Sequence, residues 1–258
     1  MIRFLGYEEP FLYPHIEKAI EIVKKKNLLL HITTNGSLVD ERMVDLLIDS
    51  EVDSIIFSFQ GLSESEYIVM RNSNHTSYEN IKSNIARLYK KRSNAKPFIK
   101  VTTTMTERDI SSNYEQFAKE FLAYVDEVQI TGYTHFTHIE KLIGYSCIYE
   151  ELKIGRPCLL SDVSCNVPNF EMIIRANGNV LPCCGAITED LLIGNITKSS
   201  LIQIWNSEQL NRIREALANK HLTLYRDCCV CPVRYSYPDR GNSLSNVMEG
   251  VFLLYKNN

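Results

Sequence analysis

The stretch CNVPNFEMIIRANGNVLPC, residues 165–183, begins and ends with a cysteine. Inside it, two runs of mainly apolar side chains, residues 171–175 and 179–181, flank the pair Asn177-Gly178, which is typical of a tight hairpin turn. Because a hairpin returns the chain toward its starting point, the two terminal cysteines should lie at the same end. This stretch therefore predicts a small β-unit that presents two thiols together.

Two further cysteines, Cys228 and Cys231, follow as a C-x-x-C pair. With Cys165 and Cys183 they provide four soft thiolate ligands from two separated segments, which indicates a metal site. We call these four residues the cysteine centre. Its spacing suits a four-cysteine zinc site and a [4Fe–4S] cluster equally well, so the residues alone leave both alternatives open.

The remaining four cysteines are weaker candidates for metal ligands. Cys184 and Cys229 each adjoin a predicted ligand and should point elsewhere, although a ligand role for them stays open. Cys158 and Cys147 are expected to be buried small side chains or spare thiols. Cys158 nevertheless lies near enough along the chain to replace Cys165 as a ligand.

The composition is that of an ordered protein with two folded units. The 258 residues are 45% hydrophobic, carry a formal net charge of −3 and include 8 cysteines, too few for a disulfide scaffold. Basic residues are scattered apart from short runs at 24–26 and 90–92, so no nucleic-acid partner is expected. No apolar run reaches the roughly 20 residues that cross a bilayer, and no signal peptide is evident. We therefore expect a cytoplasmic protein with reduced thiols and no membrane partner.

The first 130 residues alternate short β-rich runs with amphipathic helical stretches, a pattern typical of parallel strands joined by crossover helices. The predicted strands are residues 2–5, 28–33, 54–59, 98–103 and 127–130. The predicted helices are residues 14–26, 40–50, 77–91 and 113–124. Since the chain starts within the first strand, we expect the first βα unit of this layer to be missing.

Polar or glycine-bearing segments follow the first three strands, at residues 6–10, 33–36 and 58–61. Each segment alone could be an ordinary turn or helix start. Ligands bind at the carboxyl ends of parallel strands, however, where these segments should meet. Three such segments in succession at one edge therefore favour a binding site.

The same segments resemble a known family of enzymes. Residues 4–14, 34–36 and 57–61, with Tyr67 and Arg71 downstream, resemble the radical S-adenosylmethionine (SAM) enzymes. Their order along the chain strengthens the resemblance, since each segment alone is only moderately specific.

The C-terminal third resembles the SPASM or twitch extension of these enzymes. The matching segments are residues 165–168, 177–184, 193–196, 204–207 and 228–232. The resemblance implies an α/β fold with a partial (βα) barrel of the radical SAM type over residues 1–145. A small cysteine-rich α+β domain of the SPASM or twitch type would follow over residues 146–258.

The resemblance also implies roles for individual residues. Gly6, Tyr7, Glu9 and Pro10 match the edge that grips the methionine ammonium of SAM, with Glu9 as the acid. Glu8 stands where the family commonly has glycine, a departure that adds a side chain where the backbone should approach the cofactor closely.

Further along the chain, Thr34, Asn35 and Ser58 match positions that line the polar parts of SAM. Arg71 could reach the carboxylate of SAM or could be a plain surface arginine. For the cysteine centre, the resemblance implies the ligands of an auxiliary [4Fe–4S] cluster and favours iron–sulfur over zinc.

The largest departure from the family is an absent motif. The C-x-x-x-C-x-x-C loop that binds the catalytic [4Fe–4S] cluster in these enzymes occurs nowhere in the sequence. Since the missing first βα unit would carry this loop, we interpret the chain as a truncated piece of a longer enzyme. The resemblance implies that this parent forms the 5′-deoxyadenosyl radical from SAM. It would abstract hydrogen from a peptide, carbohydrate or other small substrate, with an electron-donor protein as a partner.

The rival interpretation is a degenerate, non-catalytic homologue that keeps the extension as a metal-stabilised module for binding peptides or proteins. Other features of the sequence do not decide between the two. His135 and His138 are more typical of a solvated loop than of a metal site, and Trp205 is expected to anchor the small domain. The sequence singles out no catalytic residue.

Overall fold

The structure is a computed structural model of the chain. It describes residues 1–6, 8–105, 114–132, 158–159, 164–186, 188–229, 231, 235–236 and 252–255. The chain divides into two compact units, Met1–Tyr133 with Arg240–Asn258 and Thr134–Asp239. The predicted boundary at residue 145 lies outside the described residues and stays a prediction. Within the described part of the chain, every helix is too short or too polar to cross a membrane.

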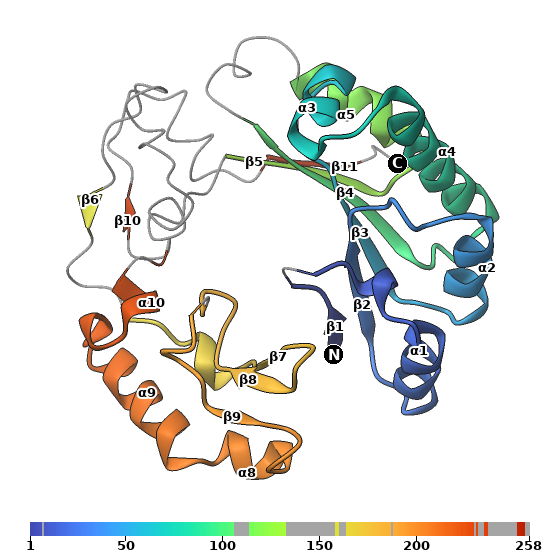
Figure 1. The fold of residues 1–258 in the computed structure, drawn as a ribbon. Helices are drawn as coiled ribbons and strands as arrows, with labels where there is room; N and C mark the ends of the chain where they lie inside the picture. The colour runs from blue at the N-terminus through green and yellow to red at the C-terminus, as the bar shows by residue number, and fades with distance from the viewer. Residues whose placement is uncertain are drawn as a thin grey trace. The chain divides into compact units, whose positions relative to one another are not determined.

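A six-stranded sheet forms the first unit, and Figure 1 shows the helices of this unit on one face of it. Five strands run parallel in chain order: β1 Ile2–Phe4, β2 Leu30–Thr34, β3 Ser54–Ser58, β4 Phe98–Met105 and β5 Glu127–Gly132. All five predicted strands are confirmed to within two residues at each end. The fold class is α/β with a parallel sheet, as predicted.

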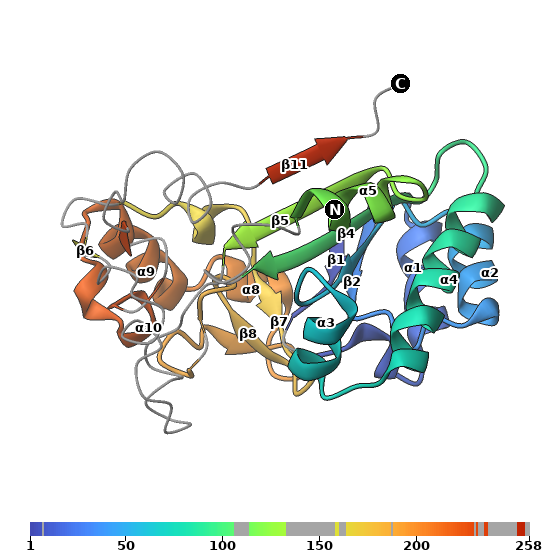
Figure 2. The ribbon, with the colours of Figure 1, turned by 90° about the horizontal axis from the view of Figure 1, so that it is seen from above.

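The sixth strand comes from the far end of the chain. β11, Phe252–Tyr255, pairs antiparallel with β5, so that Phe252 lies opposite Ile130 and Tyr255 opposite Glu127. Figure 2 shows this strand beside β5. The structure thus places a strand from the range predicted for the second domain in the sheet of the first unit.

Four helices correspond to the four that were predicted: α1 Ile16–Lys25, α2 Glu41–Asp49, α4 His75–Lys91 and α5 Tyr114–Leu122. Side-chain caps fix the start of two of them, since Asp40 accepts the N–H of Met43 at 2.8 Å and Asn74 accepts that of Ser77 at 2.9 Å. Two further elements were not predicted, the 3-10 helix η1 Pro10–Leu12 and the helix α3 Glu64–Arg71. Both include residues of the predicted SAM site.

The strands alternate buried and half-buried side chains with a period of two. In β2, Leu30, Ile32 and Thr34 are buried, whereas His31 and Thr33 between them are half-buried. The same alternation occurs in β3. One face of the sheet therefore packs into an apolar core with the helices, and half-buried side chains such as His31 and Thr33 lie on the other face.

The second unit is built on a three-stranded antiparallel sheet of β7 Ile173–Ile174, β8 Asn179–Leu181 and β9 Gly194–Asn195. The predicted hairpin is confirmed, although its first strand is shorter than expected. Gly178 has a φ of +82° in the turn, a conformation that glycine adopts readily. The Arg175 N–H donates to the Asn179 carbonyl at 2.8 Å and closes the hairpin.

Short helices complete the second unit: η3 Val167–Asn169, α8 Leu201–Trp205, α9 Glu208–Ala218, η4 Leu222–Leu224 and α10 Arg226–Cys229. Two-residue strands β6 Cys158–Leu159 and β10 Tyr235–Ser236 pair antiparallel. The Arg214 guanidinium lies 4.3 Å from the centre of the Trp205 ring and donates to the Pro168 carbonyl at 3.0 Å. Trp205 and Arg214 therefore hold α9 against the segment that follows Cys165.

Candidate functional site

Glu9 stands between β1 and η1, at the carboxyl edge of the sheet. Its Oε1 accepts a hydrogen bond from Thr34 Oγ1 at 2.7 Å, and its Oε2 accepts one from the Asn35 backbone N–H at 2.7 Å. Oε1 also accepts the Phe11 N–H at 3.3 Å, which caps the 3-10 helix. The carboxylate therefore joins the ends of β1 and β2 and is held in one orientation.

The segment after β2 is fixed by its own hydrogen bonds. Thr34 is 1% exposed, and its Oγ1 accepts the Gly36 N–H at 3.0 Å. The Asn35 Oδ1 accepts the Ser37 N–H at 2.8 Å. Gly36 has a φ of +80°, and an added Cβ would lie 2.9 Å from Ile81 Cγ2, so the turn requires glycine.

Arg71 ends α3 and lies half-buried beside the end of β3. Its Nη2 donates to the Ser58 carbonyl at 2.6 Å. Its Nε is buried and has no hydrogen-bond partner among the described residues. Burial lowers the pKa of Arg71, while Tyr67 and Glu9 act in the opposite direction. A cationic side chain with one uncommitted donor therefore lies at the same edge as the Glu9 carboxylate.

The other predicted SAM contacts lie along the same segment. Gly6 has a φ of +150°, and nothing lies within 4 Å of the place where a Cβ would be. Pro10 begins η1, and the Glu8 side chain is exposed. Tyr7 lies outside the described residues, as do His135, His138 and Cys147.

The cysteine centre lines a single cavity in the second unit. Cys165, Cys183, Cys228 and Cys231 all face it, and all four thiols are free of disulfide bonds. The hairpin brings the first two together, whereas Cys228 lies on α10 and Cys231 follows that helix in the chain. The remaining wall is mainly apolar and includes Pro168, Pro182, Leu191, Ile213, Leu217 and Leu222.

The buried thiols of this cavity hold their protons tightly. Burial raises the pKa of Cys183 and the pKa of Cys228 to about 12 each. The other three cysteines of the centre raise the pKa of Cys228 further, whereas the backbone N–H groups of Gly185 and Ala186 act against the rise at Cys183. Metal binding at these two thiols would therefore release protons.

Gly185 lets the backbone approach the sulfur atoms closely. A Cβ at this position would lie 3.3 Å from Cys231 Sγ and 3.9 Å from Cys183 Sγ. Four thiols around one cavity, with backbone N–H groups directed at Cys183, form a donor set that fits an iron–sulfur cluster. Across the described ranges, no three His, Cys, Asp or Glu side chains are grouped to hold a single metal ion.

The neighbouring cysteines differ from the centre in exposure. The Cys184 side chain is exposed, next to the half-buried Cys183. Cys158 begins β6 and Cys229 ends α10, but the positions of their side chains lie outside what the structure describes. Their predicted roles as spare or neighbouring thiols stay predictions.

A carboxylate that the sequence analysis missed also lines this cavity. Asp227 is 1% exposed, and both of its oxygens accept hydrogen bonds from Thr188. Its position next to Cys228 was the only signal in the sequence. The partner lies 39 residues earlier in the chain, so the pattern of residues gave no reason to expect burial.

Comparison with known families gives two matches. The radical SAM superfamily matches residues 3–117, and SPASM, an iron-sulfur cluster-binding domain, matches residues 165–232. Each match falls in one of the two compact units. Together they cover most of the chain.

A protein of Pyrococcus furiosus, the tungsten-containing aldehyde ferredoxin oxidoreductase cofactor-modifying protein, is 26% identical over 279 residues, covering 91% of this chain and 74% of its own. SuiB of Streptococcus suis, solved bound to the precursor peptide SuiA, has a TM-score of 0.57 at 14% identity, covering 87% of this chain and 57% of its own. The structure of anSMEcpe with bound AdoMet has a TM-score of 0.57 at 16% identity, covering 89% of this chain and 70% of its own. The two structures show a shared fold.

The family matches confirm the resemblance predicted from residues 4–14, 34–36 and 57–61 and from the cysteine-rich C-terminal third. Iron–sulfur clusters and SAM are the cofactors that the two domains imply. The chain belongs to the radical SAM superfamily and carries a SPASM iron–sulfur cluster-binding domain.

Proposed function

We propose that this chain provides the SAM-binding edge and the auxiliary cluster site of a radical SAM enzyme. The enzyme would remove a hydrogen atom from a peptide, carbohydrate or other small substrate. One observation carries the proposal: all four thiols of the cysteine centre face a single cavity in the unit that matches SPASM.

In the first unit, the methionine end of SAM would lie at the edge formed by Gly6, Tyr7, Glu9 and Pro10. The Glu9 carboxylate would accept hydrogen bonds from the ammonium, which carries three donors. Hydrogen bonds from Thr34 and Asn35 already fix the orientation of the carboxylate before SAM binds. SAM binding would therefore cost little conformational entropy at this side chain.

The polar groups of Thr34, Asn35 and Ser58 would lie along the rest of the cofactor. Arg71 would donate to the SAM carboxylate through its Nε, which has no partner among the described residues, while Nη2 stays on the Ser58 carbonyl. Arginine suits a carboxylate because its planar guanidinium presents several donors in a fixed geometry. Glu9 and Arg71 would then recognise the two charged groups of the amino-acid end.

In the second unit, Cys165, Cys183, Cys228 and Cys231 would hold an auxiliary [4Fe–4S] cluster. When bound, such a cluster supplies one-electron transfer or a place to bind the substrate. The chain's own part is to orient the thiolates and to keep water away with the apolar wall of the cavity.

The three thiolates of the catalytic cluster would come from a C-x-x-x-C-x-x-C loop outside these 258 residues. With SAM, that loop's cluster supplies the 5′-deoxyadenosyl radical, and an electron-donor protein would reduce it. Sequencing the DNA upstream of Met1 tests this part. An in-frame C-x-x-x-C-x-x-C motif agrees with it, whereas a ribosome-binding site and a stop codon directly before Met1 would favour the non-catalytic module.

Two classes of substrate agree with the relatives. SuiB was solved with a precursor peptide, and the Pyrococcus furiosus relative is named for modifying a cofactor. We therefore propose both a peptide and a small molecule as candidate substrates, and assays of the full enzyme should test each.

The auxiliary cluster can be tested on the chain as it stands. After anaerobic reconstitution, we expect about four iron and four sulfide per chain with the visible absorption of a [4Fe–4S] cluster. Replacing both Cys228 and Cys231 with alanine should abolish it, and replacing the exposed Cys184 should not. Zinc without sulfide, or full iron loading of the double variant, would refute the assignment.

A further inference from the structure

Asp227 is a buried carboxylate in the wall of the cysteine cavity. It is 1% exposed and precedes Cys228 at the start of α10. Oδ1 and Oδ2 each lie 3.1 Å from the Thr188 backbone N–H, and Oδ2 also accepts the Thr188 hydroxyl at 2.9 Å. In the described part of the chain, no lysine or arginine forms an ion pair with it. The hydrogen-bond donors that reach Asp227 from the described residues all belong to Thr188.

The contact between Asp227 and Thr188 joins the two segments that carry the cysteine centre. Thr188 follows the turn that begins at Cys183, and Asp227 belongs to the helix that carries Cys228. Together with the contact between Asp190 and the Arg226 N–H, it holds the helix that carries Cys228 against the segment that follows Cys183. The geometry therefore gives Asp227 a positioning role.

Both oxygens of Asp227 accept hydrogen bonds, from the backbone N–H and the hydroxyl of Thr188. Asp227 directly precedes Cys228 and lines the same cavity as the four thiols, so a charge on its side chain acts on the cysteine centre. Buried charges are screened much less than exposed ones.

We propose that Asp227 positions the two cysteine segments and lowers the reduction potential of the cluster that the cysteine centre holds. The proposal rests on the function proposed above for that centre. Adding one electron to a cluster beside a fixed negative charge costs energy, so the oxidised form is favoured. No bond forms or breaks in the protein, and the electron comes from the external reductant.

The test is a redox titration of the reconstituted chain with dithionite, monitored by absorption and electron paramagnetic resonance. Asp227→Asn removes the charge but keeps one oxygen that can accept from Thr188. We expect it to raise the equilibrium constant for reduction at least about tenfold, which is about 59 mV toward more positive potential for one electron.

Asp190→Asn is the matched control. Asp190 is exposed and accepts the Arg226 N–H at 2.6 Å, so it contacts the same short helix, but solvent screens its charge. Its replacement should leave the potential unchanged. An unchanged potential in Asp227→Asn, or an equal shift in Asp190→Asn, would overturn the proposal.

Thr188→Val provides a second test that keeps the charge, in case Asp227→Asn does not load a cluster. Without the hydroxyl, Asp227 loses one hydrogen-bond donor that offsets its negative charge. The reduction potential of the cluster should therefore become more negative. An unchanged or more positive potential would contradict the proposal. If the unmodified chain binds zinc and no sulfide, the function proposed for the cysteine centre is wrong. If the chain binds the cluster but Asp227→Asn leaves its reduction potential unchanged, only the present inference is wrong.

Discussion

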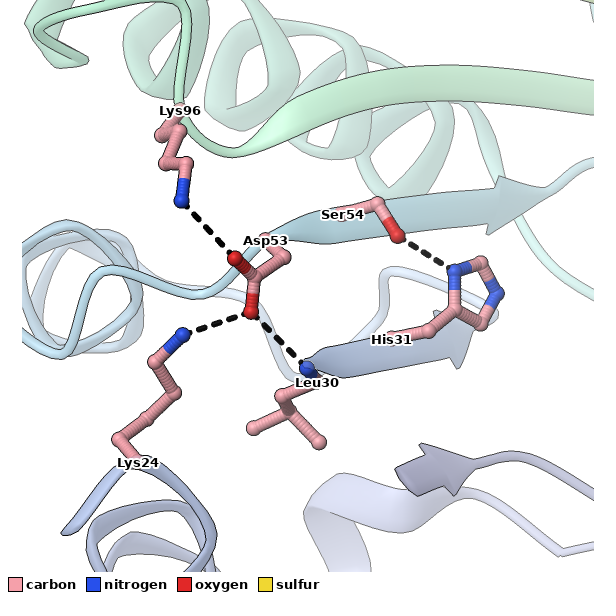
Figure 3. Close-up of polar contacts among 6 residues, drawn as sticks. All are labelled: Lys24, Leu30, His31, Asp53, Ser54 and Lys96. Atoms are coloured by element: carbon pink, nitrogen blue, oxygen red, sulfur yellow. Dashed lines mark hydrogen bonds and ion pairs between the residues drawn. The ribbon is translucent and has the colours of Figure 1, made fainter. Parts of the chain in front are cut away.

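The Asp53 carboxylate accepts the backbone N–H of Leu30 at 2.9 Å and so ties the start of β3 to the start of β2. The same carboxylate accepts hydrogen bonds from the ammonium groups of Lys24 at 2.6 Å and Lys96 at 2.9 Å (Figure 3). It lies at the amino edge of the sheet, opposite the edge that carries Glu9. The first unit thus has a structural charge network at one edge of its sheet, and the residues proposed to bind SAM at the other edge.

This network predicts an acid transition. Burial raises the pKa of Asp53, but hydrogen bonds from Lys24, Leu30 and Lys96 outweigh it and bring the pKa to about 2, below its ordinary value of 3.8. Because the folded pKa is the lower one, the stabilisation is complete above about pH 4 and is lost as the pH falls toward 2. Urea unfolding between pH 2 and pH 6 should show this loss.

Asp53→Asn should remove most of that pH dependence and lower the free energy of unfolding by about 1–3 kcal/mol at neutral pH, since a half-buried acceptor loses its charge. Asp49→Asn, at an exposed position on α2, is the control and should behave like the unmodified chain. Identical pH profiles for the two variants would show that the network does not stabilise the fold.

Glu9→Gln should weaken SAM binding roughly tenfold or more, as measured by isothermal titration calorimetry. The amide keeps the shape of the side chain but loses the charge that an ammonium requires, and its NH₂ would face the donors of Thr34 or Asn35. Glu8→Gln changes the same charge on an exposed neighbour and should have little effect. If both variants lost the same amount of SAM affinity, Glu9 would act through long-range electrostatics and not through direct contact with the ammonium.

Arg71→Met should weaken SAM binding about tenfold but leave the affinity for decarboxylated SAM unchanged, because only SAM carries the carboxylate that Arg71 is proposed to bind. Arg42→Met, on the exposed surface of α2, is the control. If Arg71→Met weakened both ligands equally, Arg71 would act by holding the Ser58 carbonyl and α3 in place.

The sequence was informative where a pattern is local. Strand periodicity identified the five parallel strands, and the Asn177-Gly178 pair identified the hairpin that brings Cys165 and Cys183 to one cavity. It was uninformative where a contact joins distant residues. A four-residue apolar run such as Phe252–Tyr255 does not specify its partner strand, because pairing depends on which edge is left open.

Helix α3 and the carboxylate of Asp227 were missed for different reasons. α3 spans eight residues with a weak apolar stripe, and its Val69 is exposed, so the usual helical pattern is faint. Its N-cap, Ser63, was the one local signal available. The burial of Asp227 depends on its contact with Thr188, which lies 39 residues earlier in the chain. The residues next to Asp227 in the sequence therefore do not predict that burial.

Gly185→Ala should weaken the cluster without disturbing the hairpin. The backbone of Gly185 lies outside the left-handed region, so alanine is not strained there, and the only obstacle is the contact of its Cβ with Cys231 Sγ at 3.3 Å. Overpacking of this kind costs about 1–3 kcal/mol. We expect lower iron content after reconstitution and roughly tenfold faster removal of iron by a chelator.

The thermal transition of the metal-free Gly185→Ala variant should match that of the unmodified chain, since without the cluster the sulfur atom of Cys231 can move aside. Cys184→Ala, one residue earlier and exposed, should retain normal iron content and release. If Gly185→Ala held iron as tightly as the unmodified chain, the close approach of the backbone to Cys231 and Cys183 would have no part in shaping the cluster site. The cysteine centre would then depend on its thiols and the apolar wall of the cavity alone.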